Sequence, residues 1–291
     1  MTFSTEYYGG HANYDDVTKD LQLTRYCGFF SNITVLMHLL CELKLKRYYP
    51  EKIKTDLTEY KNCNVYDSIY NIDLNFLENW KEFDLTRTHR FRFGTAVNLY
   101  GFGTSRDQID LELTSLLINT YFNPSNKVKD RVNLLQKSLN IDTNNGTFVW
   151  WRKTDKIREI NWYRADAKYP SIEDMLKVVK SDSPIYVQTD DLEIYETLSK
   201  NSNITLLNVL PIDKNNSTGF HIHTKSVNND EFNSLYKQSF EDYLINLVAL
   251  TVIASRCKKF VGYPGNISLY VSLIRNSFDE VFFFKNHEEF Y

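Results

Sequence analysis

The sequence predicts a two-domain α/β protein, and three observations support this. Its 291 residues exceed the usual size of one hydrophobic core, and 42% of them are hydrophobic, enough to fill two. Apolar runs of strand length alternate with segments whose apolar residues recur at helical spacing. Residues 140–147, rich in Asn and Asp with one Gly, form the best linker. We expect domains over residues 1–146 and 147–276, with a tail at 277–291 that packs back on the first domain.

In the first domain the sequence mainly predicts helices. Between Ser31 and Leu45 apolar residues recur every three or four positions after a Gly-containing loop, which predicts a helix of an α/β domain. Residues 111–121 and 128–139 predict two more helices. The turn between them, residues 123–125, offers a Ser or Asn to cap the second. Residues 52–92 follow no clear period.

The second domain begins with an apolar run that ends at two cations. Phe148-Val-Trp-Trp reads as a buried strand, and Arg152 and Lys153 follow it directly. Ligands of open α/β sheets bind beyond the carboxyl ends of the strands. A guanidinium offers a planar fork of donors to phosphate oxygens and an ammonium adds a compact charge, so this strand end suits a diphosphate. The alternative is an ordinary surface ion pair.

Two further strand ends carry polar groups. Residues 185–189 form an apolar run that ends at Asp190 and Asp191, before an amphipathic stretch at 192–200. A helical pattern at 244–257 leads into a short strand at 259–262. The following segment, Tyr263-Pro264-Gly265-Asn266-Ile267-Ser268, reads as a turn before a helix, whose backbone N–H groups can hold phosphate. Three such strand ends facing one cleft predict a nucleotide-diphosphate site.

These segments also resemble, in their order, the motifs of GDP-fucose-dependent fucosyltransferases, especially the α1,6-fucosyltransferases that modify N-glycan cores or rhizobial chitin oligomers. Gly219-Phe220-His221 and the loop Cys27-Gly28-Phe29-Phe30-Ser31-Asn32 belong to the same pattern. The resemblance covers about Thr24 to Ile274, and in most of the N-terminal half it rests on order and pattern. It implies a GT-B fold of two Rossmann-like domains with a cleft between them. It further implies transfer of L-fucose from a GDP-fucose donor to a glycan hydroxyl, with inversion at the anomeric carbon and without a metal or other cofactor.

The resemblance also implies roles for individual residues. Arg152 would stabilise charge on the leaving diphosphate, and Glu159 is the general-base candidate, with Asp166 and Glu173 as alternatives. Asp190 and Asp191 would face guanine or ribose, although we expect one of them to cap a helix. The implied donor-binding residues are Gly28, Phe29, Lys153, Asp155, Lys156, Asp190, Asp191, His221, Tyr263, Gly265, Asn266 and Ser268. His221 and His223 could instead be a metal pair, but the sequence suggests no third ligand.

Four positions depart from the family pattern. Lys153 replaces a second Arg, Trp150 replaces a His, Leu250 replaces an Asp, and Glu159 stands one position early. The family uses the positions of Trp150 and Leu250 to contact donor. A transferase for another GDP-sugar or a UDP-sugar therefore stays open, as does a noncatalytic protein that binds a sugar nucleotide or a glycan.

Charge and composition exclude other classes. A formal net charge of −3 without a basic arm argues against a nonspecific binder of nucleic acid or anionic membrane. The polar segment Met1–Asp15 predicts neither a signal peptide nor a membrane anchor, so we expect a cytoplasmic protein. The cysteines are widely separated and form no metal-type pair, which predicts reduced thiols at Cys27, Cys41, Cys63 and Cys257.

Overall fold

The protein mixes helices and strands in two compact units. The computed structural model describes residues 2–7, 10–25, 28–56, 65–85, 110–152, 171–177, 183–212, 229–263, 265–285 and 289–290. By its internal contacts the chain divides into Met1–Lys129 with Phe240–Ile245, and Asp130–Ser239 with Asn246–Tyr291. The expected α/β class is confirmed at this level.

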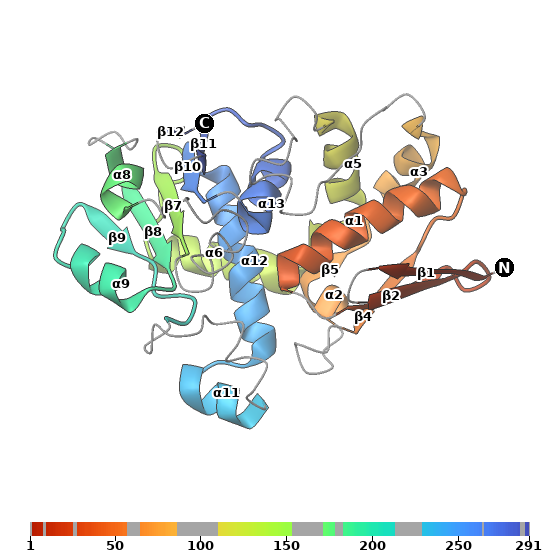
Figure 1. Ribbon diagram of the computed structural model, residues 1–291, viewed down its shortest axis with the longest axis horizontal. Coiled ribbons are helices and arrows are strands. Elements are labelled where there is room, and N and C mark those ends of the chain that lie inside the picture. Colours follow the sequence, from red (N-terminus) through yellow and green to blue (C-terminus); the bar gives the residue numbers. More distant parts are fainter. Residues whose placement is uncertain are drawn as a thin grey trace. The chain divides into compact units, whose positions relative to one another are not determined.

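A four-stranded sheet frames the first unit, in the order β1-β2-β3-β4 (Figure 1). Its strands are β1 (Thr2–Tyr7), β2 (Gly10–Asp15), β3 (Asp20–Arg25) and β4 (Lys52–Asp56). A tight turn joins β2 to β3 and makes them antiparallel; in it the Val17 N–H donates to Asp15 Oδ1 at 2.8 Å. β3 and β4 are parallel because helix α1 (Phe29–Leu45) carries the chain back between them.

The first sheet differs from the Rossmann-like sheet that the sequence predicts for this domain. Strands β1, β2 and β3 form an antiparallel meander, and β3–β4 is the parallel pair among the described strands of this unit. A turn of a few residues leaves no room for the crossover that parallel strands need. The inward positions still alternate as a strand requires, since Ala12, Tyr14, Leu21 and Leu23 are buried.

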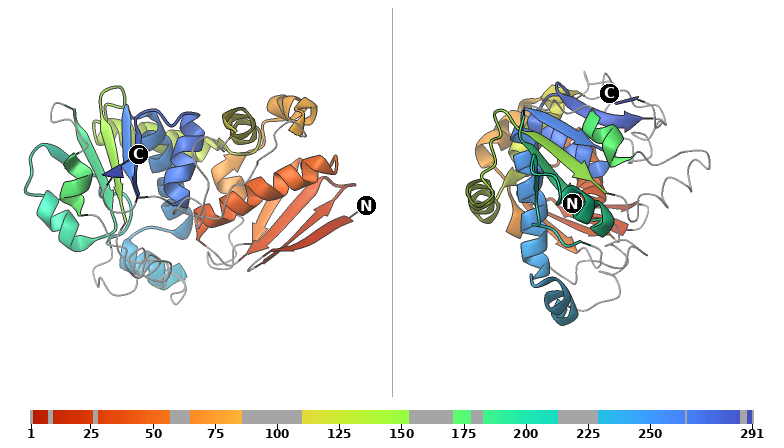
Figure 2. Two further views of the ribbon diagram at one scale, coloured as in Figure 1. Left: turned by 45° about the horizontal axis from the view of Figure 1, so that its top comes forward. Right: turned by 90° about the vertical axis from the view of Figure 1, so that its left-hand side faces the viewer.

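Helix α1 lies along one face of this sheet (Figure 2). The predicted stripe on α1 is buried, namely Ile33, Leu36, Met37, Leu40 and Leu43. The other described elements are α2 (Val65–Ile69), α3 (Leu74–Glu82), α5 (Leu111–Tyr121) and the short antiparallel pair β5 (Tyr70–Asn71) and β6 (Asn123–Pro124). Helix α5 has the predicted bounds. The predicted cap after it is also present, because the Val128 N–H donates to Ser125 Oγ at 3.4 Å.

The second unit contains a six-stranded sheet in the order β12-β11-β10-β7-β8-β9. Its strands are β7 (Thr147–Trp151), β8 (Ile185–Thr189), β9 (Ile204–Leu206), β10 (Lys259–Gly262), β11 (Val281–Lys285) and β12 (Glu289–Phe290). All pairs except β11–β12 are parallel. From β7 the chain winds outward through β8 and β9, then returns to β10 on the other side of β7. The winding therefore reverses between β7 and β10, as in doubly wound nucleotide-binding sheets.

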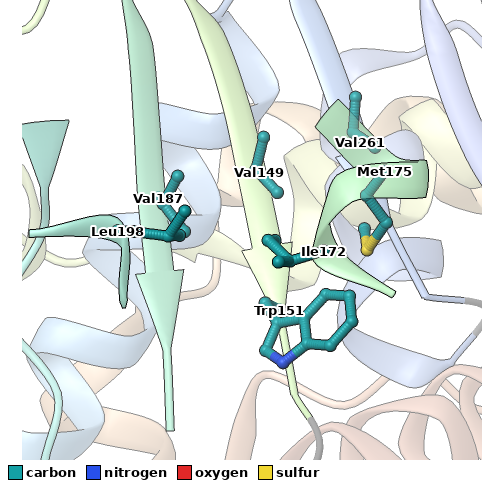
Figure 3. Close-up of a cluster of buried hydrophobic side chains, with 7 residues drawn as sticks. All are labelled: Val149, Trp151, Ile172, Met175, Val187, Leu198 and Val261. Atoms are coloured by element: carbon teal, nitrogen blue, oxygen red, sulfur yellow. The ribbon is translucent and has the colours of Figure 1, made fainter. Parts of the chain in front are cut away.

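Both faces of this sheet are covered, as a parallel sheet requires (Figure 2). On one face Val149, Trp151, Val187 and Val261 pack with Ile172 and Met175 of α8 and Leu198 of α9 (Figure 3). Phe148, Trp150 and Phe260 alternate onto the other face, where α12 and α13 lie. The helices described in this unit are α6 (Asn126–Ser138, from Asp130 on), α8 (Ile172–Lys177), α9 (Leu192–Leu198), α11 (Asn229–Tyr236), α12 (Phe240–Arg256, from Asn246 on) and α13 (Asn266–Arg275).

The C-terminal segment lies elsewhere than the sequence predicts. We expect a tail at residues 277–291 that returns to the first domain, whereas β11 pairs in parallel with β10 and extends the second sheet. The register joins Phe260 to Val281, and Val281 is buried. The apolar run Val281-Phe-Phe-Phe completes one side of the parallel sheet, which explains its place there.

Two cysteines lie within the described residues, and both are free and buried. Burial raises the pKa of the Cys257 thiol to about 12, and it raises that of Cys41 further. Both side chains are therefore protonated and unreactive at neutral pH. No helix in the described segments is long and apolar enough to cross a membrane.

Helix α9 begins at a capping carboxylate. Asp191 has extended backbone angles, and its Oδ1 accepts from the Ile194 N–H at 3.0 Å. One of the two adjacent aspartates was expected to do this, and the structure assigns the cap to Asp191.

We predict that Asp191→Ala lowers the free energy of unfolding by about 1 kcal/mol, because an orphan N–H of the first turn loses its acceptor. Urea denaturation measures the loss. Asp191→Asn, which keeps an acceptor oxygen, is the matched control and should stay within about 0.5 kcal/mol of the wild type. Equal destabilisation by both variants would contradict the capping role.

Candidate functional site

The candidate site lies at the carboxyl edge of the second sheet, where β10, β7 and β8 are neighbours. Since the three strands are parallel, the segments that follow them leave the sheet at one edge. These are Arg152 after β7, Asp190 and Asp191 after β8, and Tyr263, followed by Gly265 at the start of α13, after β10. The sequence predicts that three polar strand ends meet, and the sheet order confirms it.

Arg152 forms the central contact of this edge. Its Nε lies 3.5 Å from Oδ2 of Asp190, and the two side chains are 19% and 11% exposed. The pairing follows from register, because Trp151 pairs with Thr189 in the sheet and the next residue of each strand is the cation or the carboxylate. Arg152 continues the face of Phe148 and Trp150, and Asp190 continues the face of Tyr186 and Gln188. The predicted Arg152 is thus placed at the winding reversal, where ligands of doubly wound sheets bind.

The floor beneath this pair is buried. Gly262, Trp150 and Gln188 lie side by side across β10, β7 and β8. Gly262 is the last residue of its strand, and the other two each stand one residue before the end of theirs. Trp150 is 4% exposed and its ring packs 5.6 Å from that of Phe148, centroid to centroid. Trp150 is therefore a core residue beneath the strand ends.

Gln188 is a polar residue of this floor that the sequence reading overlooked. It is 2% exposed, and its Nε2 donates to the Thr189 carbonyl at 3.0 Å. Its Oε1 is buried without a hydrogen-bond donor among the described residues. A polar residue inside the apolar run 185–189 was the available signal.

The turn after β10 brings the N-terminus of α13 close to the sheet. Gly265 is the N-cap, with extended angles, and its carbonyl accepts from the Leu269 N–H at 2.9 Å. Ser268 Oγ donates to the Tyr263 carbonyl at 2.7 Å, which holds the turn against the first helical turn. Asn266 opens α13, and this first turn contains no acidic residue. Such a helix start offers backbone N–H groups and a positive dipole end to an anion.

Gly28 and Phe29 belong to the first unit. Gly28 is the N-cap of α1, and its carbonyl accepts from the Asn32 N–H at 3.1 Å. Phe29 is 3% exposed and packs its ring on those of Phe30 and Tyr70. Its side chain therefore contributes to the core of this unit, while the backbone of Gly28 stays at the helix start.

Arg25 supports the same loop, and the sequence reading did not single it out. It is buried at the end of β3, and its Nη1 donates to the Ser31 carbonyl at 2.9 Å and to Ser31 Oγ at 3.3 Å. A cation at a strand end before a Gly-containing loop was the signal. It ties the first turn of α1 to the sheet.

Several predicted residues lie outside the described segments: Lys153, Asp155, Lys156, Glu159, Asp166 and His221, with His223. Glu173, an alternative base, is exposed in the first turn of α8. Leu250 is fully buried in α12 and cannot contact a ligand from there. Within the described residues no three His, Cys, Asp or Glu side chains gather as a metal site would require.

Gly262 allows the close approach of α13. A Cβ atom at this position would lie 2.7 Å from Ser268 Oγ and 2.8 Å from Cζ of Phe260. We predict that Gly262→Ala lowers the free energy of unfolding by about 1–3 kcal/mol, because the strand end and the first turn of α13 must separate. Urea denaturation tests this, with exposed Ser202→Ala as the control, expected within about 0.5 kcal/mol of wild type. An unchanged stability in Gly262→Ala would contradict the close packing.

Comparison with known proteins bears on the fold. No protein-family model and no curated protein sequence matches the chain. A crystal structure of NodZ α-1,6-fucosyltransferase soaked with GDP-fucose matches with a TM-score of 0.51 at 10% identity, over 93% of this chain and 97% of that one. The NodZ structure co-crystallised with GDP gives 0.52 at 10% identity, over 93% and 96%. Fucosyltransferase NodZ from Bradyrhizobium gives 0.51 at 10% identity, over 93% and 96%. The chain therefore shares its fold with the fucosyltransferase NodZ, as the sequence resemblance implies.

Proposed function

We propose that the protein is a glycosyltransferase that transfers L-fucose from GDP-fucose to a hydroxyl of a glycan. The observation that carries the proposal is Arg152, paired with Asp190 at the winding reversal of a doubly wound parallel sheet. The shared fold with NodZ, whose structures were obtained with GDP-fucose and with GDP, supports the choice of donor.

The proposed donor site uses cations and backbone donors for the diphosphate. Arg152 would bind the β-phosphate, with Lys153, Asp155, Lys156 and His221 nearby in sequence or by family pattern. The N-terminus of α13, from Tyr263 to Ser268, would supply N–H groups to phosphate oxygens. In this proposal Arg152, the two lysines and the helix N-terminus stabilise the diphosphate without a metal ion.

The proposed reaction is a single displacement with inversion. The bond between the fucose anomeric carbon and the diphosphate oxygen breaks as the acceptor oxygen bonds to the opposite face of that carbon. Glu159, still the base we propose from sequence, takes the proton of the acceptor hydroxyl, and GDP leaves with the electron pair of the broken bond. In this step Arg152 stabilises the transition state, because negative charge grows on the diphosphate as the bond breaks.

The proposed architecture is GT-B, with an acceptor-side domain over residues 1–146 and a donor domain over residues 147–276. The strand order of the second unit supports the donor domain. Gly28 at the start of α1 would reach the donor through its backbone, since the Phe29 ring is buried.

A specific observation favours one alternative. Trp150 and Leu250 are buried apolar residues where the family contacts donor, so these donor contacts differ from the family pattern. A transferase that uses another GDP-sugar, or a UDP-sugar, fits the same diphosphate site.

We predict that GDP stabilises the protein against heat and UDP does not. A ligand that binds only the folded state adds about 2.7 kcal/mol at 100 times its Kd, which a thermal shift assay detects. Equal shifts of the melting temperature with GDP and UDP would contradict recognition of guanine and favour a UDP-sugar as an alternative donor. No shift with GDP, UDP or ADP would remove the sugar-nucleotide site altogether.

We also predict that Arg152→Ala lowers kcat with GDP-fucose about a hundredfold or more while circular dichroism stays unchanged, because charge stabilisation in the transition state is lost. Arg152→Lys should recover little of it, since an ammonium keeps the charge but loses the planar fork. Arg256→Lys, at the exposed end of α12, is the control for replacing an arginine and should retain turnover. Turnover near the wild-type rate in Arg152→Ala would contradict the proposed mechanism.

A further inference from the structure

Asp190 combines a buried position with contact to the proposed phosphate-binding cation. Asp190 is 9% exposed, and its Oδ2 lies 3.5 Å from Nε of Arg152. The family resemblance implies that this carboxylate faces guanine or ribose. In the structure its contact is instead with Arg152, the cation of the proposed diphosphate site.

The backbone around Asp190 is held on both sides. Before it, the Thr189 carbonyl accepts from Gln188 Nε2 at 3.0 Å. After it, the Asp191 N–H donates to Thr189 Oγ1 at 3.1 Å, and Asp191 caps α9 through the Ile194 N–H. The Asp190 side chain therefore projects from a fixed point between the end of β8 and the start of α9. A carboxylate on such a point can impose an orientation on its partner.

The negative charge of Asp190 does not favour binding of a diphosphate at Arg152. A negative charge next to Arg152 repels a bound diphosphate and reduces the attraction of the cation for it. A carboxylate at this position therefore weakens binding of the diphosphate in the ground state. Any benefit to the reaction must come from the orientation it gives to Arg152. A guanidinium has two edges that can form paired hydrogen bonds, and an acceptor beside Nε fixes the rotation of the plane.

We propose that Asp190 is a positioning residue, which sets the guanidinium plane of Arg152 so that its terminal nitrogens face the diphosphate. Asp190 then contributes to the rate of transfer through Arg152 alone and contacts neither sugar nor base. The catalytic part of this inference rests on the proposed glycosyltransferase function, whereas the orientation of Arg152 by Asp190 does not.

The orientation is testable without any substrate. In protein labelled with ¹⁵N, the Nε–H signal of Arg152 is identified as the signal lost in Arg152→Lys. We expect Asp190→Asn to accelerate its exchange with water about tenfold or more, because the negative charge 3.5 Å from Nε no longer holds the guanidinium in place. An unchanged exchange rate would overturn the inference, whatever the protein catalyses.

The matched control is Glu280→Gln. Lys259 Nζ lies 3.6 Å from Oε2 of Glu280, so this ion pair has nearly the same length and belongs to the same sheet, at the amino end of β10. Its loss should leave both the Arg152 signal and turnover unchanged. A change of the Arg152 signal in Glu280→Gln equal to that in Asp190→Asn would show a general loss of structure, and would overturn the specific role of Asp190.

The kinetic signature is a split between binding and rate. Asp190→Asn should lower kcat about tenfold or more, while the Kd for GDP stays the same or decreases because a repelling charge is gone. Asp190→Glu keeps the charge but moves the carboxylate by one methylene, so it should also lower kcat. A Kd for GDP that rises in parallel with the fall in kcat would mean that Asp190 contacts the nucleotide itself, and would overturn the inference.

A double-mutant cycle separates this inference from the proposed function. In the Arg152→Lys background, Asp190→Asn should change kcat by less than about twofold, because no guanidinium remains to be oriented. Additive losses in the double variant would refute action through Arg152. A wild-type protein that turns over no sugar nucleotide would refute the proposed function, while the exchange measurement would still decide whether Asp190 orients Arg152.

Discussion

The site depends on the order of the parallel strands in the second unit. Because β10 and β8 lie on either side of β7, the segments that follow all three leave the sheet at one edge. The winding reverses between β7 and β10, and ligands of doubly wound sheets bind at such a reversal. Residues more than a hundred positions apart, such as Arg152 and Asn266, meet at this edge through strand pairing alone.

Strand pairing also gives the two adjacent carboxylates different roles. Successive residues of a strand point to opposite faces, so Asp190 follows the face of Trp150 and Arg152, and Asp191 turns to the N-terminus of α9. One aspartate contacts the cation and the other fixes the chain. The pair of Arg152 and Asp190 is partly buried, so solvent screens it less than it screens a surface ion pair.

The sequence predicted the second sheet better than the first, for a physical reason. Strands β7, β8 and β10 are buried on both faces and have apolar centres, and the α5 pattern has a clear period. Strands β1 to β3 bury only one face, so their short apolar-polar alternation was missed in a polar segment. Strand β11 was assigned to a tail by analogy with two-domain sugar transferases, whereas its apolar run pairs with β10.

The site was predicted in its residues more than in its contacts. Arg152 and Asp190 stood out as polar residues after apolar runs, and a cap by one aspartate was expected. Their mutual contact depends on strand register, which the sequence does not reveal. The roles of Gln188 and Gly262 depend on their neighbours in the fold. The amide oxygen of Gln188 is buried, and the Ser268 hydroxyl lies close to Gly262. Such roles require the neighbouring strands to be in place.

A crystal structure of the protein with GDP tests the central claim most directly. The account predicts the diphosphate above the carboxyl ends of β7 and β10, with its β-phosphate within hydrogen-bond distance of the Arg152 terminal nitrogens and Asp190 still beside Nε. A nucleotide bound elsewhere on the chain, or a diphosphate at this edge without contact to Arg152, would contradict it.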